Sequence, residues 1–249
     1  MKHLVKALIA MSFFCQLLAC SSTSEIDTSK PEVAFKMGEN YEKDERFEEA
    51  IAQFSGVKNK HPYSKLATES ELRIAEIYFK RDEFIEAQNA SQVFKEMRPT
   101  HPRIDYVTFR LALSFFNQLP TTIDRDLAVA ERAILYFDEV IQSYPDSKHV
   151  KEAKEHKRKA LTMLAEKEYY IGNFYFIRER WESALGRFED LMTRYPGLGL
   201  DAKVLYGATL SAYHLKESAK AKTYFEKLTS RFKDSTEAEK ARREIGNSI

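Results

Sequence analysis

The 249-residue sequence contains little cysteine, glycine or proline, and it has no excess of charge of either sign. Eight Gly and seven Pro provide few tight turns, which disfavours a fold with many strands. The 39 basic and 38 acidic residues leave a formal net charge of +1, so the charge balance does not indicate nucleic-acid binding. Hydrophobic residues make up 43% of the chain and charged residues 31%. This balance fits an all-helical fold with a core and solvated outer faces.

Both cysteines lie in the first twenty residues, MKHLVKALIAMSFFCQLLAC. Lys2 and Lys6 precede an apolar stretch that is shorter than the about 20 residues a membrane-spanning helix needs. We therefore predict a signal peptide over 1–19. Its end, Leu-Leu-Ala-Cys, resembles the bacterial lipobox, so Cys20 is expected to carry S-diacylglycerol and N-acyl lipid. The alternative is an ordinary signal peptide that ends in a cysteine by accident.

Cleavage before Cys20 leaves a chain with no thiol for a disulfide and a net charge of 37 − 38 = −1, because two lysines are removed. The polar segment 20–31 is then a lipidated flexible tether. Two or more acyl chains anchor a protein stably to a membrane. In families with this signal, Ser21 after the cysteine implies an outer-membrane location, facing the periplasm.

A repeat of small, aromatic and apolar residues runs through the rest of the chain. The small residues that anchor it are Ala50, Ala87, Ala133, Ala184 and Ala221. Four residues later stand Phe54, Ser91, Phe137, Phe188 and Phe225. The positions that close the units are Pro62, Pro99, Pro145, Pro196 and, in the fifth unit, Lys233. This is the tetratricopeptide pattern.

Physical reasons explain these residue types. Two antiparallel helices cross closely where small residues meet, and aromatic side chains fill the space between neighbouring helices. Proline ends the second helix because it cannot continue one. The sequence thus predicts an all-α, right-handed superhelical solenoid of five tetratricopeptide-like helical hairpins.

The anchors are separated by 37, 46, 51 and 37 residues, whereas a standard unit has about 34. The third unit carries an insertion at 117–126. Asp124 or Asp126, at the end of this insertion, is expected to cap the next helix. The extra residues before the fourth unit predict one long helix, roughly 148–178. We therefore predict three N-terminal repeats over 32–146, a joining helix over 147–178 that includes the first helix of repeat 4, and two C-terminal repeats over 179–245.

Further caps are expected where polar residues follow the repeats. Ser64 and Ser147 can each accept a backbone N–H of the next helix. Near the end, Asp234, Ser235 and Thr236 can also cap a helix, and Glu239 has the spacing to complete a capping box with Thr236. Trp181 aligns with repeat aromatics and is expected to pack in the core.

Catalytic and metal-binding motifs are not found in the sequence. It has no G-x-S-x-G, no H-E-x-x-H and no glycine-rich phosphate loop, so no enzyme is predicted. His149, Glu152 and His156 share one helical face, but they lie in a charged stretch typical of a solvated surface. We expect no metal and no cofactor other than the lipid on Cys20.

The details beyond the repeat resemble the BamD family, lipoproteins of the machinery that folds β-barrels into the bacterial outer membrane. The stretches that carry the resemblance are the lipobox, HPRIDYVTFRLALSFFNQ, the IDRD insertion, SYPDSKHVKEA and LAEKEYYIGNFYFIRERWESALGRFEDLMTRYP. It covers the lipobox and about 33–233. The fifth repeat departs from it, because it has no closing Pro and the first helix near 207–213 is hard to place.

The resemblance implies a membrane-tethered scaffold without catalysis. Its C-terminal half would dock the barrel-forming BamA-type subunit, its N-terminal repeats would receive unfolded β-barrel proteins, and other assembly lipoproteins are possible partners. Arg187, three residues after Ala184, is the residue we expect to bind the barrel-forming subunit; the alternative is a local helix pair with Ser183 or Asp190. For substrate reception we expect the first-helix residues Phe35, Glu39, Arg73, Phe79, Tyr106 and Arg110.

Two other functions stay open at this point. One is a periplasmic tetratricopeptide adaptor for cell-wall synthesis or division. The other is a wall-processing enzyme, although no pair of carboxylates stands in a defined loop. The insertion and the long joining helix favour the assembly scaffold.

Overall fold

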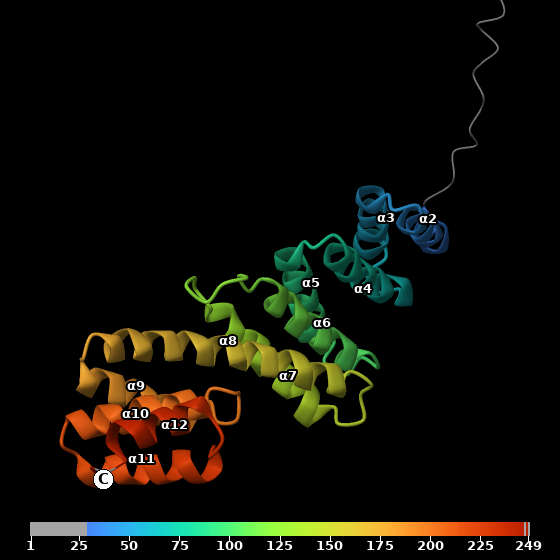
Figure 1. The fold of residues 1–249 in the computed structure, drawn as a ribbon. Helices are drawn as coiled ribbons and strands as arrows, with labels where there is room; N and C mark the ends of the chain where they lie inside the picture. Colours follow the sequence, from blue (N-terminus) through green and yellow to red (C-terminus); the bar gives the residue numbers. More distant parts are fainter. Residues whose placement is uncertain (1–28, 247, 249) are drawn as a thin grey trace, which may run out of the picture. The chain divides into compact units, whose positions relative to one another are not determined.

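The computed structural model describes residues 29–246 and 248, and all regular elements in this part of the chain are α-helices. The chain separates into two compact units, one ending at Ile74 and the other beginning at Ala75. Figure 1 shows the succession of helices along the chain. The predicted signal peptide, Cys20, Ser21 and most of the tether lie outside the described residues. The predicted division at 146/147 and 178/179 stays a prediction.

The helices follow one another in hairpins. They are α2 (Pro31–Lys43), α3 (Phe47–Lys60), α4 (Lys65–Lys80), α5 (Phe84–Met97), α6 (Ile104–Asn117), α7 (Ala128–Ser143), α8 (Val150–Ile177), α9 (Trp181–Arg194), α10 (Asp201–His214), α11 (Ser218–Arg231) and α12 (Thr236–Ile245). The predicted all-helical fold of tetratricopeptide hairpins with a long joining helix is confirmed.

The turn inside four of the hairpins has the same backbone conformation. Its residue with a positive φ is Glu45, Asp82, Glu179 or Lys216, at 58°, 58°, 58° and 63°. Left-handed backbone is uncommon for residues other than glycine, so the composition did not point to these turns. The third hairpin has the insertion in place of this turn.

The first unit is built on the hairpin of α2 and α3. Ala50 and Phe54 are fully buried, and Gly38 leaves room for the Phe54 ring. A Cβ at Gly38 would lie 2.8 Å from that ring, which is why a glycine is needed there. The small residue therefore accommodates an aromatic ring of the opposing helix.

The second unit begins with the end of α4 and continues through α5, α6 and α7. Phe94, Leu111 and Phe137 are buried there. The N-cap of α7 is Leu127, so the expected cap by Asp124 or Asp126 is wrong. Asp126, one residue before that position, accepts a hydrogen bond on Oδ1 from the Ala128 N–H at 2.9 Å.

The long helix α8 packs against α7 and then against α9. Ala165 and Gly172 are buried along its later turns. A Cβ at Gly172 would lie 2.9 Å from the ring of Phe188, the repeat aromatic of α9. None of the helices in the described part of the chain is long and apolar enough to cross a membrane.

The fifth hairpin, α10 and α11, forms without a closing proline. The Phe232 N–H donates to Leu228 O at 2.9 Å, as the Tyr195 N–H donates to Leu191 O at the end of α9. A final helix, α12, packs against α10 and α11. Its cap is Ser235, whose Oγ accepts from the Ala238 N–H at 3.1 Å. The capping box predicted from Thr236 and Glu239 is wrong, because the helix begins at Thr236, one residue earlier than that motif requires.

Candidate functional site

Three of the residues predicted to receive substrate come together in the second unit. Phe79 lies near the C-terminal end of α4, while Tyr106 and Arg110 are one turn apart on α6. The Arg110 guanidinium carbon is 3.4 Å from the centre of the Phe79 ring and 5.9 Å from that of Tyr106. We call Phe79, Arg103, Tyr106 and Arg110 the aromatic–arginine cluster.

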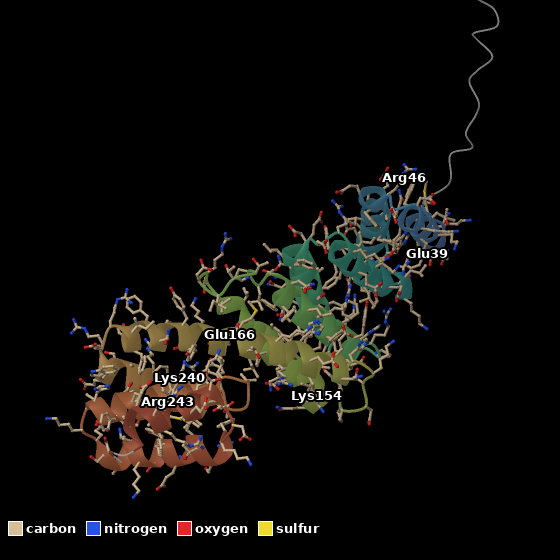
Figure 2. The ribbon with its side chains drawn as sticks, viewed as in Figure 1. Glu39, Arg46, Lys154, Glu166, Lys240 and Arg243 are labelled. Atoms are coloured by element: carbon tan, nitrogen blue, oxygen red, sulfur yellow. The ribbon has the colours of Figure 1, made fainter. Side chains whose placement is uncertain are left out.

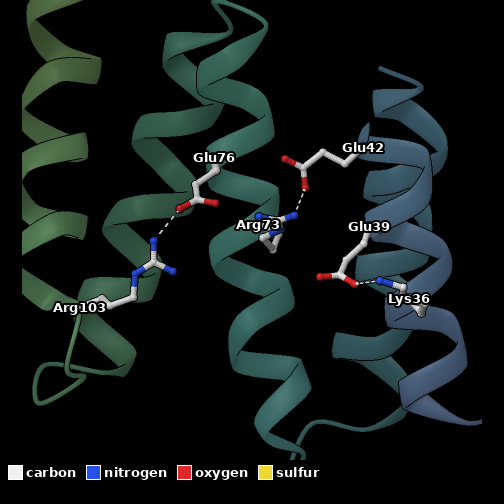
Figure 3. A network of polar contacts seen from close by, with 6 residues as sticks. All are labelled: Lys36, Glu39, Glu42, Arg73, Glu76 and Arg103. Carbon is white, nitrogen blue, oxygen red and sulfur yellow. Dashed lines mark hydrogen bonds and ion pairs between the residues drawn. The ribbon is translucent and has the colours of Figure 1, made fainter. Parts of the chain in front are cut away.

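Arg103, which the sequence reasoning missed, adds a second cation to this cluster. Its Nη2 is 2.9 Å from Glu76 Oε1 (Figure 3). Its guanidinium carbon lies 4.8 Å from the Tyr106 ring centre. The signal that could have found it is spacing, because Arg103, Tyr106 and Arg110 are three and four residues apart. That spacing places them on one face of the helix.

Arg110 is half-buried, and its Nε is buried without a hydrogen-bond partner among the described residues. Burial lowers the pKa of its guanidinium below the ordinary value, partly offset by Tyr106 and by Glu76 and Glu152. Buried N–H groups of this kind are uncommon, because leaving one unpaired costs about 1–3 kcal/mol. The cluster therefore places a partly buried cation beside aromatic rings.

Polar groups border the cluster where α6 approaches the start of α8. The His149 ring stacks on Phe109 with centres 4.7 Å apart and lies 5.5 Å from Tyr106. Burial and Lys148 lower the pKa of His149. Burial acts to raise the pKa of the Asp105 carboxyl, but hydrogen bonds from Ser147 Oγ, at 2.6 Å, and from backbone groups hold it below its ordinary value.

The other predicted substrate residues lie in the first unit. Phe35 is partly buried with its ring edge toward Phe54, at 5.2 Å between centres. Glu39 Oε2 pairs with Lys36 Nζ at 3.0 Å. Arg73 Nη2 lies 2.7 Å from Oε2 of Glu42, a carboxylate that is 4% exposed (Figure 3). Arg73 thus neutralises a buried charge inside the unit.

Arg187 stands on α9 with its side chain 43% exposed. Its Nη1 is 3.0 Å from Glu168 Oε2 on α8, so its ion pair crosses between helices instead of joining Ser183 or Asp190. Such exposed pairs contribute only about 0–1 kcal/mol, so Arg187 can exchange this partner at little cost. A guanidinium can grip a carboxylate with two parallel hydrogen bonds.

Within the described residues, no three His, Cys, Asp or Glu side chains gather closely enough to hold a metal ion. The His149 ring is stacked as described above, and His156 Nδ1 is 3.0 Å from Glu152 O with its ring against Phe116 and Phe137. Trp181 is partly buried and stacks on His214 at 4.2 Å between ring centres. All three side chains therefore take part in packing.

Comparison with known proteins gives consistent results. A family model described as "Outer membrane lipoprotein" (YfiO) matches residues 27–200, and a tetratricopeptide-repeat model matches residues 203–235. The second match covers most of the fifth hairpin, which the sequence pattern had placed with difficulty.

The chain is similar to curated proteins named outer membrane protein assembly factor BamD. It is 28% identical to that of Caulobacter vibrioides over 59% of this chain and 48% of the relative. It is 24% identical to that of Neisseria meningitidis over 76% of this chain and 77% of the relative. The match to the Caulobacter protein thus spans about half of that protein's length.

A solved structure, the TPR2AB domain of yeast Sti1 in a pHSP90 complex, covers 84% of this chain at a TM-score of 0.43 and 16% identity. That TM-score is too low to add to the fold assignment. The match of the lipoprotein family model extends over well more than half of the chain and runs from the segment before α2 to the end of α9 and beyond. The chain belongs to the YfiO/BamD family of outer membrane lipoproteins.

Proposed function

We propose that this protein is a lipid-anchored scaffold that assists the assembly of β-barrel proteins in the outer membrane. The observation that carries this proposal is the family membership over residues 27–200. The hairpin fold supports it, because stacked helical repeats provide extended surfaces for binding segments and domains. In this proposal the protein has no catalytic step of its own.

The proposed anchor is a diacylglyceryl group on Cys20 together with an N-acyl chain. With several acyl chains the protein would stay at the membrane on the periplasmic side. Replacing Cys20 by Ser and separating membranes from soluble periplasm tests this. The wild-type protein should be found with the outer membrane, and Cys20→Ser should be soluble or retain its signal peptide; wild-type protein found soluble contradicts the proposal.

For the barrel-forming subunit we propose docking through Arg187. Its exposed guanidinium is positioned by α9 and by the exchangeable pair with Glu168. We expect Arg187→Glu to reduce capture of that subunit at least about tenfold, since truncating or reversing an interfacial charge pair costs several kcal/mol. Arg194→Glu is the matched control, because Arg194 is an exposed arginine of the same helix.

A further pair of variants separates docking from a purely structural role. If Arg187 binds a partner carboxylate, Glu168→Gln should leave capture intact, whereas Arg187→Gln should weaken it. If Arg187 only holds α9 to α8, both variants should weaken capture equally, and the docking proposal is then wrong. Undiminished capture by Arg187→Glu, at unchanged helicity, also rejects it.

For unfolded β-barrel proteins we propose reception at the aromatic–arginine cluster. A peptide ending in an aromatic residue and a free carboxylate can place its ring beside Phe79 and its charge near the guanidinium of Arg110, which lies over the Phe79 ring. Arg110→Met should weaken binding of such a peptide, and amidation of the peptide's C-terminus should weaken binding to the wild type by a similar factor. The amidated peptide should bind Arg110→Met no more weakly than the free acid does.

Crosslinking provides a second measurement for reception. A photo-crosslinker at Phe79 should label the peptide, while one at Val93, an exposed apolar residue of α5, should not. Equal labelling from the two positions would contradict the assignment. We also propose that the first unit contacts unfolded β-barrel proteins through Phe35, Glu39 and Arg73. A photo-crosslinker at each of these positions tests this in the same way.

A further inference from the structure

The C-terminal half of α8 is apolar on two faces. One face carries Ala165 and Gly172, which are buried along α9. The other carries Tyr170, Phe174 and Ile177, which are 62%, 43% and 68% exposed. An exposed apolar face of this kind is typical of a surface that binds a partner.

The exposed residues continue a regular spacing along α8. We call Met163, Lys167, Tyr170, Phe174 and Ile177 the outer stripe, and they are separated by four, three, four and three residues. Met163 and Lys167 are partly buried, and Lys167 Nζ donates to Arg125 O at 2.6 Å. This alternation is the seam along which two helices pack as a coiled coil. It extends over about 21 Å of helix at 1.5 Å per residue, which matches two heptads of a partner helix.

A groove of ≈ 380 Å³ adjoins the N-terminal end of the outer stripe. It lies between α8 and the insertion of the third hairpin, and its lining includes Met163 and Glu166 of α8. The apolar side chains that line it from the other side are Phe116, Leu119, Pro120 and Ile123. Glu166 projects from this part of α8 (Figure 2). A side chain of a partner segment can enter such a groove, whereas a flat lipid surface cannot fill it.

The charges beside the outer stripe are unlike at its two ends. Arg178 and Arg180 are exposed at the C-terminal end, and the Arg178 guanidinium carbon lies 3.7 Å from the centre of the Phe174 ring. Glu166 stands at the groove end. A complementary segment therefore has acidic residues over the two arginines and a basic residue near Glu166.

The helix dipole gives this segment a direction. The C-terminal end of α8 carries partial negative charge, which attracts the N-terminus of another helix. Acidic residues are also favoured in the first turn of a helix, where they would meet Arg178 and Arg180. Both effects favour a partner helix that runs antiparallel to α8.

We propose that the outer stripe and its groove bind an amphipathic helix of a partner protein, antiparallel to α8, with heptad-spaced apolar residues and an acidic first turn. Tyr170 lies about 200° around the helix from Glu168, the residue that holds Arg187. The stripe is thus separate from the proposed docking point at Arg187, and this inference does not rest on that proposal.

Photo-crosslinking in cells that express the full-length protein tests the proposal. A crosslinker is placed at Glu166, Tyr170 or Ile177, and the cross-linked peptide is identified by mass spectrometry. Ile177 should reach the acidic N-terminal part of a segment with apolar residues three and four apart, and Glu166 should reach the same segment about three turns later. Controls are Lys154, an exposed polar position on α8, and Ile85, an exposed apolar position on α5.

The charge argument has its own variant. Arg178→Glu combined with Arg180→Glu should lower the crosslink yield from Tyr170 at least about threefold. Lys151→Glu combined with Lys154→Glu makes the same charge change on exposed residues near the N-terminal end of α8 and should leave the yield unchanged. Crosslinks to lipid, to a second copy of this chain or to a segment without the stated pattern overturn the proposal. So do yields no higher than those from Lys154 and Ile85.

Discussion

Replacing Gly207 by alanine tests how the C-terminal hairpins pack. A Cβ at Gly207 would lie 2.4 Å from Cε2 of Phe188 and 2.6 Å from its Cζ. The ring cannot move away from α10 either, because Gly172 of α8 lies close to its other side. A Cβ at Gly172 would be only 2.9 Å from Phe188 Cε1. The ring is held between two glycines of different helices, so an added methyl group has no space.

The magnitude follows from two opposing contributions. Overpacking a core costs about 1–3 kcal/mol, and the upper end applies because the ring cannot withdraw. Alanine in place of glycine favours a helix by about 1 kcal/mol. We therefore expect Gly207→Ala to lower the free energy of unfolding by about 2 kcal/mol, which lowers Tm by about 4–8 °C for a chain of this size. Urea unfolding followed by circular dichroism measures it.

Gly186→Ala is the matched control, because a Cβ at this exposed helical position meets no atom within 4 Å. It should raise stability by about 0.5–1 kcal/mol through helix propensity alone. In a Phe188→Leu background, the cost of Gly207→Ala should fall by at least about 1 kcal/mol, since the two residues are coupled by contact. Gly207→Ala as stable as the wild type, or an unchanged cost in that background, would refute this packing.

Three further predictions concern caps, ionisation and a buried ion pair. Ser235→Ala should destabilise α12 by about 1 kcal/mol, seen as faster amide exchange there, while Thr236→Ala should have a smaller effect; equal effects would contradict the assigned cap. Burial and the hydrogen bond to Glu244 raise the pKa of Tyr206 to about 12, so its stabilising contribution is present below pH 10 and is lost as pH rises toward 12. Tyr206→Phe should remove one late-ionising phenol from an ultraviolet titration, and an unaltered titration curve argues against the contact. Arg73→Met should lower the free energy of unfolding of the first unit by about 2–3 kcal/mol, because Glu42 stays buried without its partner. Arg46→Met, which removes an exposed pair with Glu49, should change it by less than about 1 kcal/mol. Urea unfolding of both variants measures this, and equal losses would contradict the prediction.

Residue spacing was sufficient to predict the helical hairpins and the long helix. Ala50, Ala184 and Phe188 recur because helix crossings need small and aromatic residues at fixed positions, and such local rules are written in the sequence. The fifth hairpin was difficult because the marker used for the helix end, proline, is absent. The helix α11 ends without it at Phe232, whose backbone leaves the helical conformation with φ −126° and ψ 43°.

Side-chain partners were harder to predict because they depend on how separate helices meet. The sequence singled out Arg187, and the partners that it suggested within the chain, Ser183 and Asp190, lie on the same helix. The partner in the structure, Glu168, stands 19 residues earlier on α8. It singled out Phe79, Tyr106 and Arg110 but not Arg103, whose pairing with Glu76 joins positions 27 residues apart. The cap of α12, Ser235, was one of three candidates in the sequence, because Asp234, Ser235 and Thr236 are all competent caps and only the backbone geometry distinguishes them.

Affinity purification of the full-length protein from detergent-solubilised outer membranes tests the proposed scaffold role most directly. We predict that a large β-barrel protein with periplasmic domains is recovered with the wild type and with Arg194→Glu, and is lost with Arg187→Glu. Recovery of cell-wall synthases alone would contradict the account and favour a wall-synthesis adaptor instead.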